Sequence, residues 1–589
     1  MTSAARSFTR LSIACPGGVR HDIKEALARD GTPESQSRDM SDVAAERSKD
    51  MFPTLSEAQL QRIASYGTRR YVPAGELLFD QGTVALGIRV VLGGSLEVVR
   101  PGIAGSDLIT VHRAGAFSGE VNVLAGRRSL VRGRMVEGGD VLFIDQPGLR
   151  RLIEEDTDVS DVLMRAFILR RVALISRGAG DATLVGSAHS AGTLRLQEFF
   201  TRNGHPYAYI DVDRDPDVQT LLDQFRVGVE DVPIVICRGE DVLKNPTNEA
   251  VAQCFGLNAA IDAERVRDLV VVGGGPGGLA AAVYAASEGL SVLVLEANAP
   301  GGQAGTSSKI ENYFGFPTGI SGQALSARGL AQAEKFGAEL AVASRVERFK
   351  CGGEKGYEIT LSNAVIRARA IIIASGVQYR RLALDNVDRF DGAGIYYAAT
   401  ATEARLCGGD EVAVVGGANS AGQAAVFLAG QAKHVHVLVR GAGLADTMSR
   451  YLIRRIEESP NITVHTHTEL VALDGDDHLR SVTWRGPGGD ERHSLRHAFL
   501  MVGAQPNTAW LAECVALDAR GFVKTGADLS AEDLSSTAWP LARAPFLFET
   551  NRHRVFAVGD VRSGSVKRVA AAVGEGSVCV QLVHRALAE

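Results

Sequence analysis

Three glycines at fixed spacing follow an apolar strand and form the clearest chemical feature of the sequence. The run 269–272 leads into Gly273, Gly275 and Gly278, and an alanine-rich helical segment comes next. The first glycine permits a tight turn, the second lets the backbone approach a pyrophosphate, and the third lets helix and strand pack closely. The following apolar run ends at Glu296, which is placed to accept hydrogen bonds from ribose hydroxyls. This pattern predicts a dinucleotide site rather than a glycine-rich loop that only packs.

A second strand–turn–helix unit begins after the apolar run 412–415, with alanine at its second and third glycine positions. The strand that follows its helix ends at Arg440, where the first unit has an acid. An arginine there favours a 2′-phosphate, and therefore NADPH over NADH, although Arg440 also fits a solvated surface charge. Arg450 is a second candidate. The residues predicted to bind the nicotinamide dinucleotide are Gly416, Gly417, Asn419, Ser420 and Arg440.

The two glycine turns lie about 140 residues apart, which indicates that one domain is inserted into another. The last part of the chain should then return to the first domain. It contains the strand 555–558, followed by Gly559 and Asp560. This ending resembles the closing flavin motif of flavoproteins with two dinucleotide-binding domains, in which the aspartate binds the ribityl chain.

Residues from about 266 to 589 resemble bacterial thioredoxin reductase through the motifs 301–303, 310–313, 374–376, 502–508, 559–560 and 567–568. The resemblance implies an FAD-binding domain over 266–377 and 506–589, with an NAD(P)H-binding domain inserted at 378–505. It also implies that Asn312 lies near the isoalloxazine and that Arg568 follows its pyrimidine edge. Pattern and resemblance together give these FAD-binding residues: Gly273, Gly275, Pro276, Gly278, Glu296, Gly302, Gln303, Asn312, Gly376, Gly559, Asp560 and Arg568.

The same resemblance places a redox Cys-x-x-Cys just before the second glycine turn, where this chain has Ala399 and Thr402. Neither side chain can form a disulfide or a thiolate adduct with flavin, so no catalytic residue is predicted there. Glu403 stands where the family has its acid. Cys407 follows without a nearby partner in the sequence. It is expected to be a packed structural cysteine, and a disulfide (thioredoxin) reductase that uses Cys407 is the alternative.

Two further resemblances concern the N-terminal half. Residues 1–50 are expected to form a mobile arm. Residues 51–177 resemble a cyclic-nucleotide-binding domain, a β-roll with C-terminal helices. In that family a glutamate accepts the ribose 2′-hydroxyl and an arginine pairs with the cyclic phosphate. The segment between the two is one or two residues shorter here, so a roll kept only for packing or dimerisation is the alternative. The resemblance assigns the site to Gly119, Glu120, Arg128 and Ser129.

Residues 182–258 resemble a thioredoxin or glutaredoxin domain, with Val232-Pro233 as the cis-proline loop of that family. The redox cysteines of such a domain would fall near 187–190, and the sequence has none there. A docking surface is therefore expected rather than a redox activity, and His189 is expected to be a solvated loop residue.

Composition excludes several classes of protein. The chain of 589 residues carries a formal charge of −6, which argues against general nucleic-acid binding and against adsorption to an anionic membrane. The sequence contains no run of about 18 apolar residues, so no membrane span is predicted. No signal segment is apparent either, and we therefore expect a cytoplasmic location. The dispersed cysteines are expected to be reduced structural thiols, without metal-binding spacing, at positions 15, 237, 254, 351, 407, 514 and 579.

The predicted fold class is a multidomain α/β chain with a β-roll, a thioredoxin-like unit and two nested Rossmann-like domains. The predicted function is an FAD-dependent oxidation of NADPH, or of NADH. The electrons would pass to a small-molecule or protein acceptor other than a dithiol, such as an iron–sulfur protein, a quinone or oxygen, and a cyclic nucleotide would regulate the transfer. A flavin-based redox sensor with little turnover is the alternative. Without a dithiol, the nicotinamide and flavin sites are expected to rest side by side, in a protein that is a homodimer by default.

Overall fold

The computed structural model describes residues 50–589 apart from 103–104, 120–122, 125–126, 177–181, 188–189, 214–230, 238–240, 259–260, 308, 351–355, 385, 477 and 512–513. Glu120, His189 and the expected arm up to residue 49 therefore lie outside the described residues. The chain divides into two compact units after Arg177.

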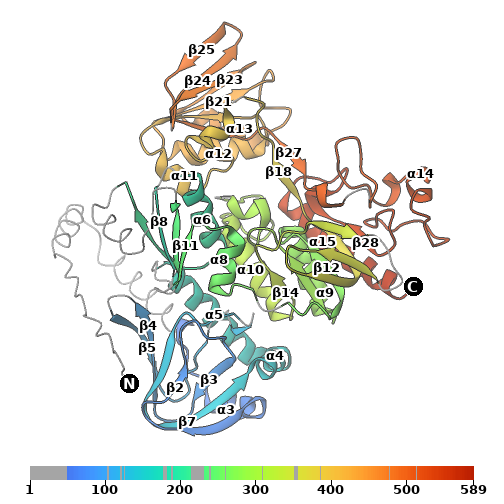
Figure 1. The fold of residues 1–589 in the computed structure, drawn as a ribbon. Helices are drawn as coiled ribbons and strands as arrows, with labels where there is room; N and C mark the ends of the chain where they lie inside the picture. Colours follow the sequence, from blue (N-terminus) through green and yellow to red (C-terminus); the bar gives the residue numbers. More distant parts are fainter. Residues whose placement is uncertain are drawn as a thin grey trace, which may run out of the picture. The chain divides into compact units, whose positions relative to one another are not determined.

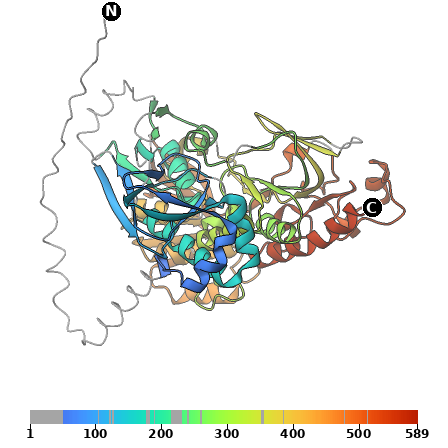
Figure 2. The same cartoon turned by 90° about the horizontal axis from the view of Figure 1, so that it is seen from below.

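Unit 1 is a β-roll followed by helices (Figures 1 and 2). Its elements are α3 (Glu57–Ile63), β1 (Thr68–Val72), β2 (Leu77–Phe79), β3 (Gly87–Val91), β4 (Ser95–Gly102), β5 (Gly105–His112), β6 (Arg132–Glu137), β7 (Gly139–Asp145), α4 (Gln146–Glu155) and α5 (Thr157–Ser176). The strands form two antiparallel sheets, ordered β1-β7-β3 and β2-β6-β4-β5. Apolar side chains of the roll and of α4 and α5 share one core, in which the rings of Phe117 and Phe167 form a T-shaped pair.

The C-terminal helices expected for this domain are α4 and α5, which are separate helices rather than one continuous helix. The backbone leaves the helical conformation at Asp156, between α4 and α5. The Asp156 carboxylate accepts a hydrogen bond from the Val159 amide at 3.1 Å and one from Arg62 at 2.7 Å. A carboxylate that caps the second helix satisfies its free amides, so Asp156 separates the two helices although the apolar spacing continues across it.

The first sheet of unit 2 contains the strands that position the first glycine turn. Its elements are β12 (Val266–Val272), α9 (Pro276–Ser287), β13 (Val292–Leu295), α10 (Gly322–Lys335), β14 (Glu339–Ala341), β15 (Arg348–Lys350), β16 (Tyr357–Thr360), β17 (Val365–Ile373), β28 (Val555–Ala557) and α15 (Val569–Leu587). The strand order is β14-β13-β12-β17-β16-β15, and β28 pairs with β17 in parallel. The C-terminal segment therefore returns to the first sheet, which confirms the predicted nesting of two Rossmann-like folds (Figure 1).

A second, parallel sheet carries the other glycine turn. Its strands are ordered β19 (Ile395–Tyr396), β26 (His497–Leu500), β20 (Glu411–Val415), β21 (His434–Val439) and β22 (Ile462–Thr466). The helices here are α11 (Ala401–Leu406), α12 (Asn419–Ala429) and α13 (Arg450–Glu458), and β23 (Glu469–Gly475), β24 (Leu479–Gly486) and β25 (Gly489–His493) form a smaller antiparallel sheet. Two antiparallel strands, β18 (Val377–Tyr379) and β27 (Ala504–Pro506), make the double connection between the two regions.

A four-stranded sheet precedes these regions in the chain. Its order is β11 (Asp241–Lys244), β10 (Ile234–Cys237), β8 (Ala182–Gly186) and β9 (Tyr207–Asp211), and α6 (Ala191–Arg202) and α8 (Asn248–Phe255) share a core with one face of it. The Val232–Pro233 peptide is cis, as predicted.

The expectation that all cysteines are reduced is wrong at this sheet. Cys237 on β10 and Cys254 on α8 form a disulfide, with their Cα atoms 6.6 Å apart. The strand and the helix pack against each other in one core. That packing brings together two residues whose separation of 17 positions matches no motif in the sequence.

Candidate dinucleotide-binding site

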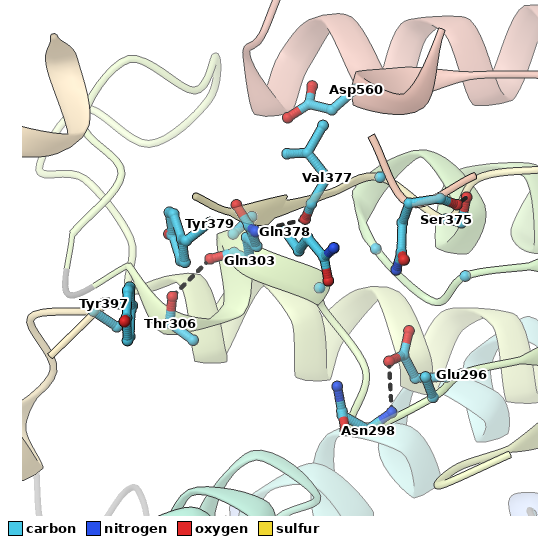
Figure 3. Close-up of a pocket in the computed structure, with 18 of the residues that line it drawn as sticks. Glu296, Asn298, Gln303, Thr306, Ser375, Val377, Gln378, Tyr379, Tyr397 and Asp560 are labelled. Carbon is cyan, nitrogen blue, oxygen red and sulfur yellow. Dashed lines mark hydrogen bonds between the residues drawn. The ribbon is translucent and has the colours of Figure 1, made fainter. Parts of the chain in front are cut away.

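One large cavity in unit 2 collects most of the residues predicted to bind FAD. Its volume is about 930 Å³, which is in the upper range for sites of small organic ligands and cofactors. Figure 3 shows the cavity running from Glu296 and Asn298 past Gln303 and Val377 to Tyr397. Of the predicted FAD residues only Gly278 is absent from the lining; those present are Gly273, Gly275, Pro276, Glu296, Gly302, Gln303, Asn312, Gly376, Gly559, Asp560 and Arg568.

The glycine turn between β12 and α9 has the geometry that the spacing predicts. Gly273 has a φ of +110°, and a Cβ there would lie 2.2 Å from the Ala374 carbonyl oxygen. A Cβ on Gly278 would lie 1.9 Å from the Gly273 carbonyl oxygen, so this glycine serves helix–strand packing rather than the cavity. Gly275 borders open space, since a Cβ there would meet nothing nearer than Gly302 Cα at 3.9 Å. The N terminus of α9 thus faces a space that fits a pyrophosphate.

Glu296 lies at the end of β13 and is 8% exposed. Its Oε2 accepts a hydrogen bond from the Gly274 amide at 2.7 Å, and its Oε1 accepts one from the Asn298 amide at 2.9 Å. These bonds fix the carboxylate beside the glycine turn and leave lone pairs for the hydroxyls of a ribose.

The middle of the cavity is lined by groups held in place by short hydrogen bonds (Figure 3). Gln303 Nε2 donates to the Val377 carbonyl at 2.5 Å, and the Thr306 hydroxyl donates to the Gln303 carbonyl at 2.8 Å. Burial raises the pKa of Asp560, which follows β28. Burial also raises the pKa of Tyr379. A fixed set of polar groups among apolar side chains such as Ile310 and Val377 is suited to orient a planar cofactor.

The far end of the cavity contains the segment that replaces the dithiol. Tyr397, Ala398 and Glu403 line it, and no cysteine is among the described residues that do. The Glu403 Oε2 accepts from the Thr400 amide at 2.9 Å, and burial raises the pKa of this carboxyl. The backbone of Thr402 is described, as part of α11, but its side chain is not.

Cys407 is buried in the core behind this segment rather than in the cavity. Its side chain is 1% exposed and its thiol donates to the Glu403 carbonyl at 2.9 Å. Burial raises the pKa of Cys407 to about 12. A thiol of this kind is protonated at neutral pH and is therefore a poor nucleophile.

The second glycine turn contributes to the same cavity through the start of α12. Asn419 and Ser420 line the cavity, whereas Gly416, Gly417 and Arg440 do not. Gly416 packs against Met501, the residue after β26, because a Cβ there would lie 2.4 Å from the Met501 carbonyl oxygen. Arg440 and Arg450 are both exposed.

A loop that the sequence patterns did not reveal completes this second turn. Thr447 Oγ1 donates to the Gly417 carbonyl at 2.7 Å, and Asn419 Oδ1 accepts from the Ser449 amide at 2.8 Å. Two hydroxyl residues shortly before a helix are a capping signal, which sequence reasoning could have used.

Unit 1 has its own cavity, of about 240 Å³, inside the roll. Gly119 and Ser129 line it, but Arg128 does not; it pairs with Val84 in an isolated β-bridge. The sequence patterns missed the arginines that line it from the strands and from α5, namely Arg89, Arg100 and Arg170. Arg170 is 7% exposed and donates to the Gly119 carbonyl at 2.8 Å, which ties α5 to the cavity wall.

Two negative findings hold for the described part of the chain. No helix in it is both long and apolar enough to cross a bilayer. No group of three or more His, Cys, Asp or Glu side chains in it is arranged to hold a metal ion.

Models of two known protein families match this chain, one in its C-terminal half and one in its N-terminal part. The model of the pyridine nucleotide-disulphide oxidoreductases matches residues 267–576. The model of the cyclic nucleotide-binding domain matches residues 69–156.

Curated relatives cover the same C-terminal part. A thioredoxin reductase of Streptomyces coelicolor is 32% identical over 53% of this chain and 91% of its own length. The NADPH-dependent thioredoxin reductase 3 of Arabidopsis thaliana is 31% identical over 59% of this chain, which spans 65% of that protein. Among solved structures, thioredoxin reductase of Lactococcus lactis matches with a TM-score of 0.49 and 26% identity, over 55% of this chain and 99% of that one.

Proposed function

The chain belongs to the pyridine nucleotide-disulphide oxidoreductase family, and from this premise we propose that it oxidises NADPH through a bound FAD and reduces an acceptor that is not a dithiol. It is an oxidoreductase of the FAD/NAD(P)H type. The proposal assigns FAD to 266–377 and 506–589 and the nicotinamide dinucleotide to 378–505, in a homodimer. The cavity supports it most directly, since its described lining combines residues of both glycine turns and contains no thiol.

The residues of the cavity fit an FAD molecule. The amides at the start of α9 would hold the pyrophosphate, and Glu296 would accept the hydroxyls of a ribose. Gln303, Thr306 and Asp560 would hold the polar edge of the flavin and its ribityl chain. A bound flavin supplies the ability to accept a hydride from a nicotinamide and to pass the electrons on.

The electron exit differs from that of a disulfide reductase. Ala399 has no redox chemistry. Cys407 is a buried, protonated thiol, and its S–H group donates a hydrogen bond to the Glu403 carbonyl. The protein therefore relies on direct access of the acceptor to the cavity. Tyr397 and Glu403 lie at that end and would shape the access.

The roll of unit 1 would bind a cyclic nucleotide and regulate the reductase. Arg89, Arg100 and Arg170 supply positive charge at the cavity, which suits a cyclic phosphate. Arg170 on α5 also donates to the carbonyl of Gly119 in the cavity wall. A ligand that displaces Gly119 would therefore also move α5.

Anaerobic titration tests the proposal. Purified protein is titrated with NADPH and then with NADH, with and without cAMP, and the visible absorbance of the flavin is recorded. We expect bleaching by NADPH and then steady NADPH consumption once ferricyanide or a quinone is added. Reduction that occurs once and stops would favour the redox-sensor alternative. A protein that neither contains nor takes up FAD would refute the proposal.

A further inference from the structure

Helix α6 of the four-stranded sheet ends at the wall of the dinucleotide cavity. Its last residue, Arg202, lines the cavity, and its side chain is only 15% exposed. The Arg202 Nη2 donates to the Gly302 carbonyl at 2.7 Å and to the Ala299 carbonyl at 3.2 Å. Its Nη1 donates to Glu198 at 3.0 Å. The guanidinium of a helix that packs on the four-stranded sheet thus holds a loop of the region that contains the first glycine turn.

The loop held by Arg202 packs directly on the first glycine turn. The Gly301 amide donates to the Gly274 carbonyl at 2.7 Å. A Cβ on Gly302 would lie 3.1 Å from the Gly275 Cα, so the two backbones touch. Arg202 is therefore separated from the predicted pyrophosphate position by a single layer of backbone.

The positive charge of Arg202 also reaches the middle of the cavity. Burial raises the pKa of Tyr379, and the charge of Arg202 opposes this rise. Arg202 Nε is buried and has no hydrogen-bond acceptor within the described chain. One N–H of the guanidinium is thus unpaired among the described residues, and its charge is shared with the Glu198 carboxylate, which is 46% exposed.

Other contacts fix α6 in this position. Gln323 Nε2, at the start of α10, donates to the Thr201 carbonyl at 2.9 Å. Asn258 exchanges two hydrogen bonds with the Val342 backbone, both at 2.8 Å. Val342 and Ala343 belong to the same core as the four-stranded sheet. At the other end of α6, Leu194 packs against the core of the second glycine-turn sheet.

We propose that Arg202 is a positioning residue for the cofactor, which the unit 182–258 supplies to the flavin site. Its charge and its hold on Gly302 stabilise the pyrophosphate of the bound FAD. The unit that lacks a redox motif at 187–190 is then a fixed part of the flavin site rather than a docking surface for a partner. This inference rests on the FAD binding proposed above.

The test measures FAD affinity of the full-length protein rather than its activity. Apoprotein is prepared for the wild type, Arg202→Met and Arg202→Lys, and the dissociation constant of FAD is measured from flavin fluorescence at low and high salt. We expect Arg202→Met to bind FAD at least tenfold more weakly and Arg202→Lys to recover part of the loss. The difference between wild type and Arg202→Met should shrink as salt rises, because salt screens a charge effect but not a packing defect.

Lys244→Met is the structural control. Lys244 lies on β11 of the same unit, outside the cavity lining, and donates to Asp231 at 2.7 Å. We expect this variant, which also removes a positive charge from the unit, to show no salt-dependent loss of FAD affinity. If Arg202→Met does not fold, amide hydrogen exchange of the wild-type protein is measured instead, with and without FAD. Bound FAD should then slow the exchange of the α6 amides.

Two results would overturn the inference and are distinguishable. If wild type binds FAD and Arg202→Met binds it equally well, or α6 exchange does not respond to FAD, Arg202 has no such role. If the wild type binds no FAD at all, the proposed function fails and this inference fails with it.

Discussion

Glu296 and Cys407 show at the residue scale how burial decides what an ionisable side chain can do. Both are nearly inaccessible to solvent. Glu296 accepts hydrogen bonds from two backbone amides, so its oxygens are fixed where a ribose would bind. The Cys407 thiol instead donates a hydrogen bond to the Glu403 carbonyl, which favours the protonated thiol. The first residue is suited to binding, and the second to packing.

Replacing Glu296 should weaken FAD binding. In Glu296→Gln, a neutral amide replaces a carboxylate that accepts from Gly274 and Asn298, and one of these amides loses its acceptor. A hydrogen bond to a charged group contributes about 1.5–3 kcal/mol, so we expect a loss of at least tenfold in FAD affinity, measured by flavin fluorescence. Glu288→Gln, which changes a surface pair with His584, is the control. Equal affinity of both variants would contradict the assignment of Glu296.

Replacing Cys407 should leave electron transfer intact. We expect Cys407→Ser to bleach with NADPH and to reduce ferricyanide at rates within about twofold of wild type, since a thiol with a pKa of about 12 is not a redox group at neutral pH. Burial of a protonated thiol is favourable below the ordinary thiol pKa and is lost as the pH rises towards 12. Wild type should therefore lose stability above about pH 9 more steeply than Cys407→Ser in urea titrations. Loss of aromatic-disulfide reduction in the variant would instead support a thiol mechanism.

At the scale of elements, one capping residue and one returning strand define the architecture. Asp156 separates α4 from α5, and β28 brings the end of the chain back beside β17. Capping is visible in the sequence only as one acid in an apolar periodic stretch. The return of β28 follows from the predicted Gly-Asp ending, because that ending has a role only beside the first sheet.

Removing the cap between α4 and α5 should destabilise unit 1. Asp156→Ala deletes the acceptor of the Val159 amide, which typically costs about 1 kcal/mol. The hydrogen bond from Arg62 lowers the pKa of Asp156, so its contribution is present above the ordinary aspartate pKa and is lost as the pH falls below it. Urea unfolding followed by circular dichroism should therefore differ between variant and wild type at pH 7 and converge towards pH 2.

Asp158→Ala is the control for that effect. Asp158 also pairs with Arg62, but its side chain is exposed and does not cap the helix. We expect a clearly smaller change in stability. Equal effects of the two variants would show that the ion pairs, and not the cap, hold the junction.

At the scale of the whole unit, an ion pair joins the region of the second glycine turn to a loop of the first. Arg455 on α13 contacts Glu311 at 2.6 Å, and Lys309 contacts the same carboxylate at 3.1 Å. Burial would raise the pKa of Glu311, but the hydrogen bonds from Lys309 and Arg455 hold it below its usual value. This contact bears on the expectation that the nicotinamide and flavin sites rest side by side, which stays a prediction.

Breaking that ion pair should change flavin reduction only modestly. A partly exposed pair contributes about 0–1 kcal/mol, so Arg455→Met should change the rate of flavin bleaching by NADPH by no more than about fivefold in stopped-flow experiments. The difference in bleaching rate between wild type and Arg455→Met should shrink under acid conditions, because Glu311 becomes protonated there and the ion pair is lost. Arg454→Met, which removes an exposed pair with Glu458 on the same helix, should have no effect. A change of a hundredfold would show that this contact sets the orientation of the two regions.

The amino-acid sequence was sufficient to predict both glycine turns, Glu296, the nesting of the two folds and the absence of a dithiol at Ala399 and Thr402. These features depend on local spacing, because a turn, a helix start and a strand end are fixed by neighbouring residues. The burial of Cys407 confirms the expectation of a packed cysteine. The disulfide between Cys237 and Cys254 and the position of Arg202 beside Gly302 emerged only from the folded chain. Each of those depends on packing between segments distant in the chain, which no local pattern records.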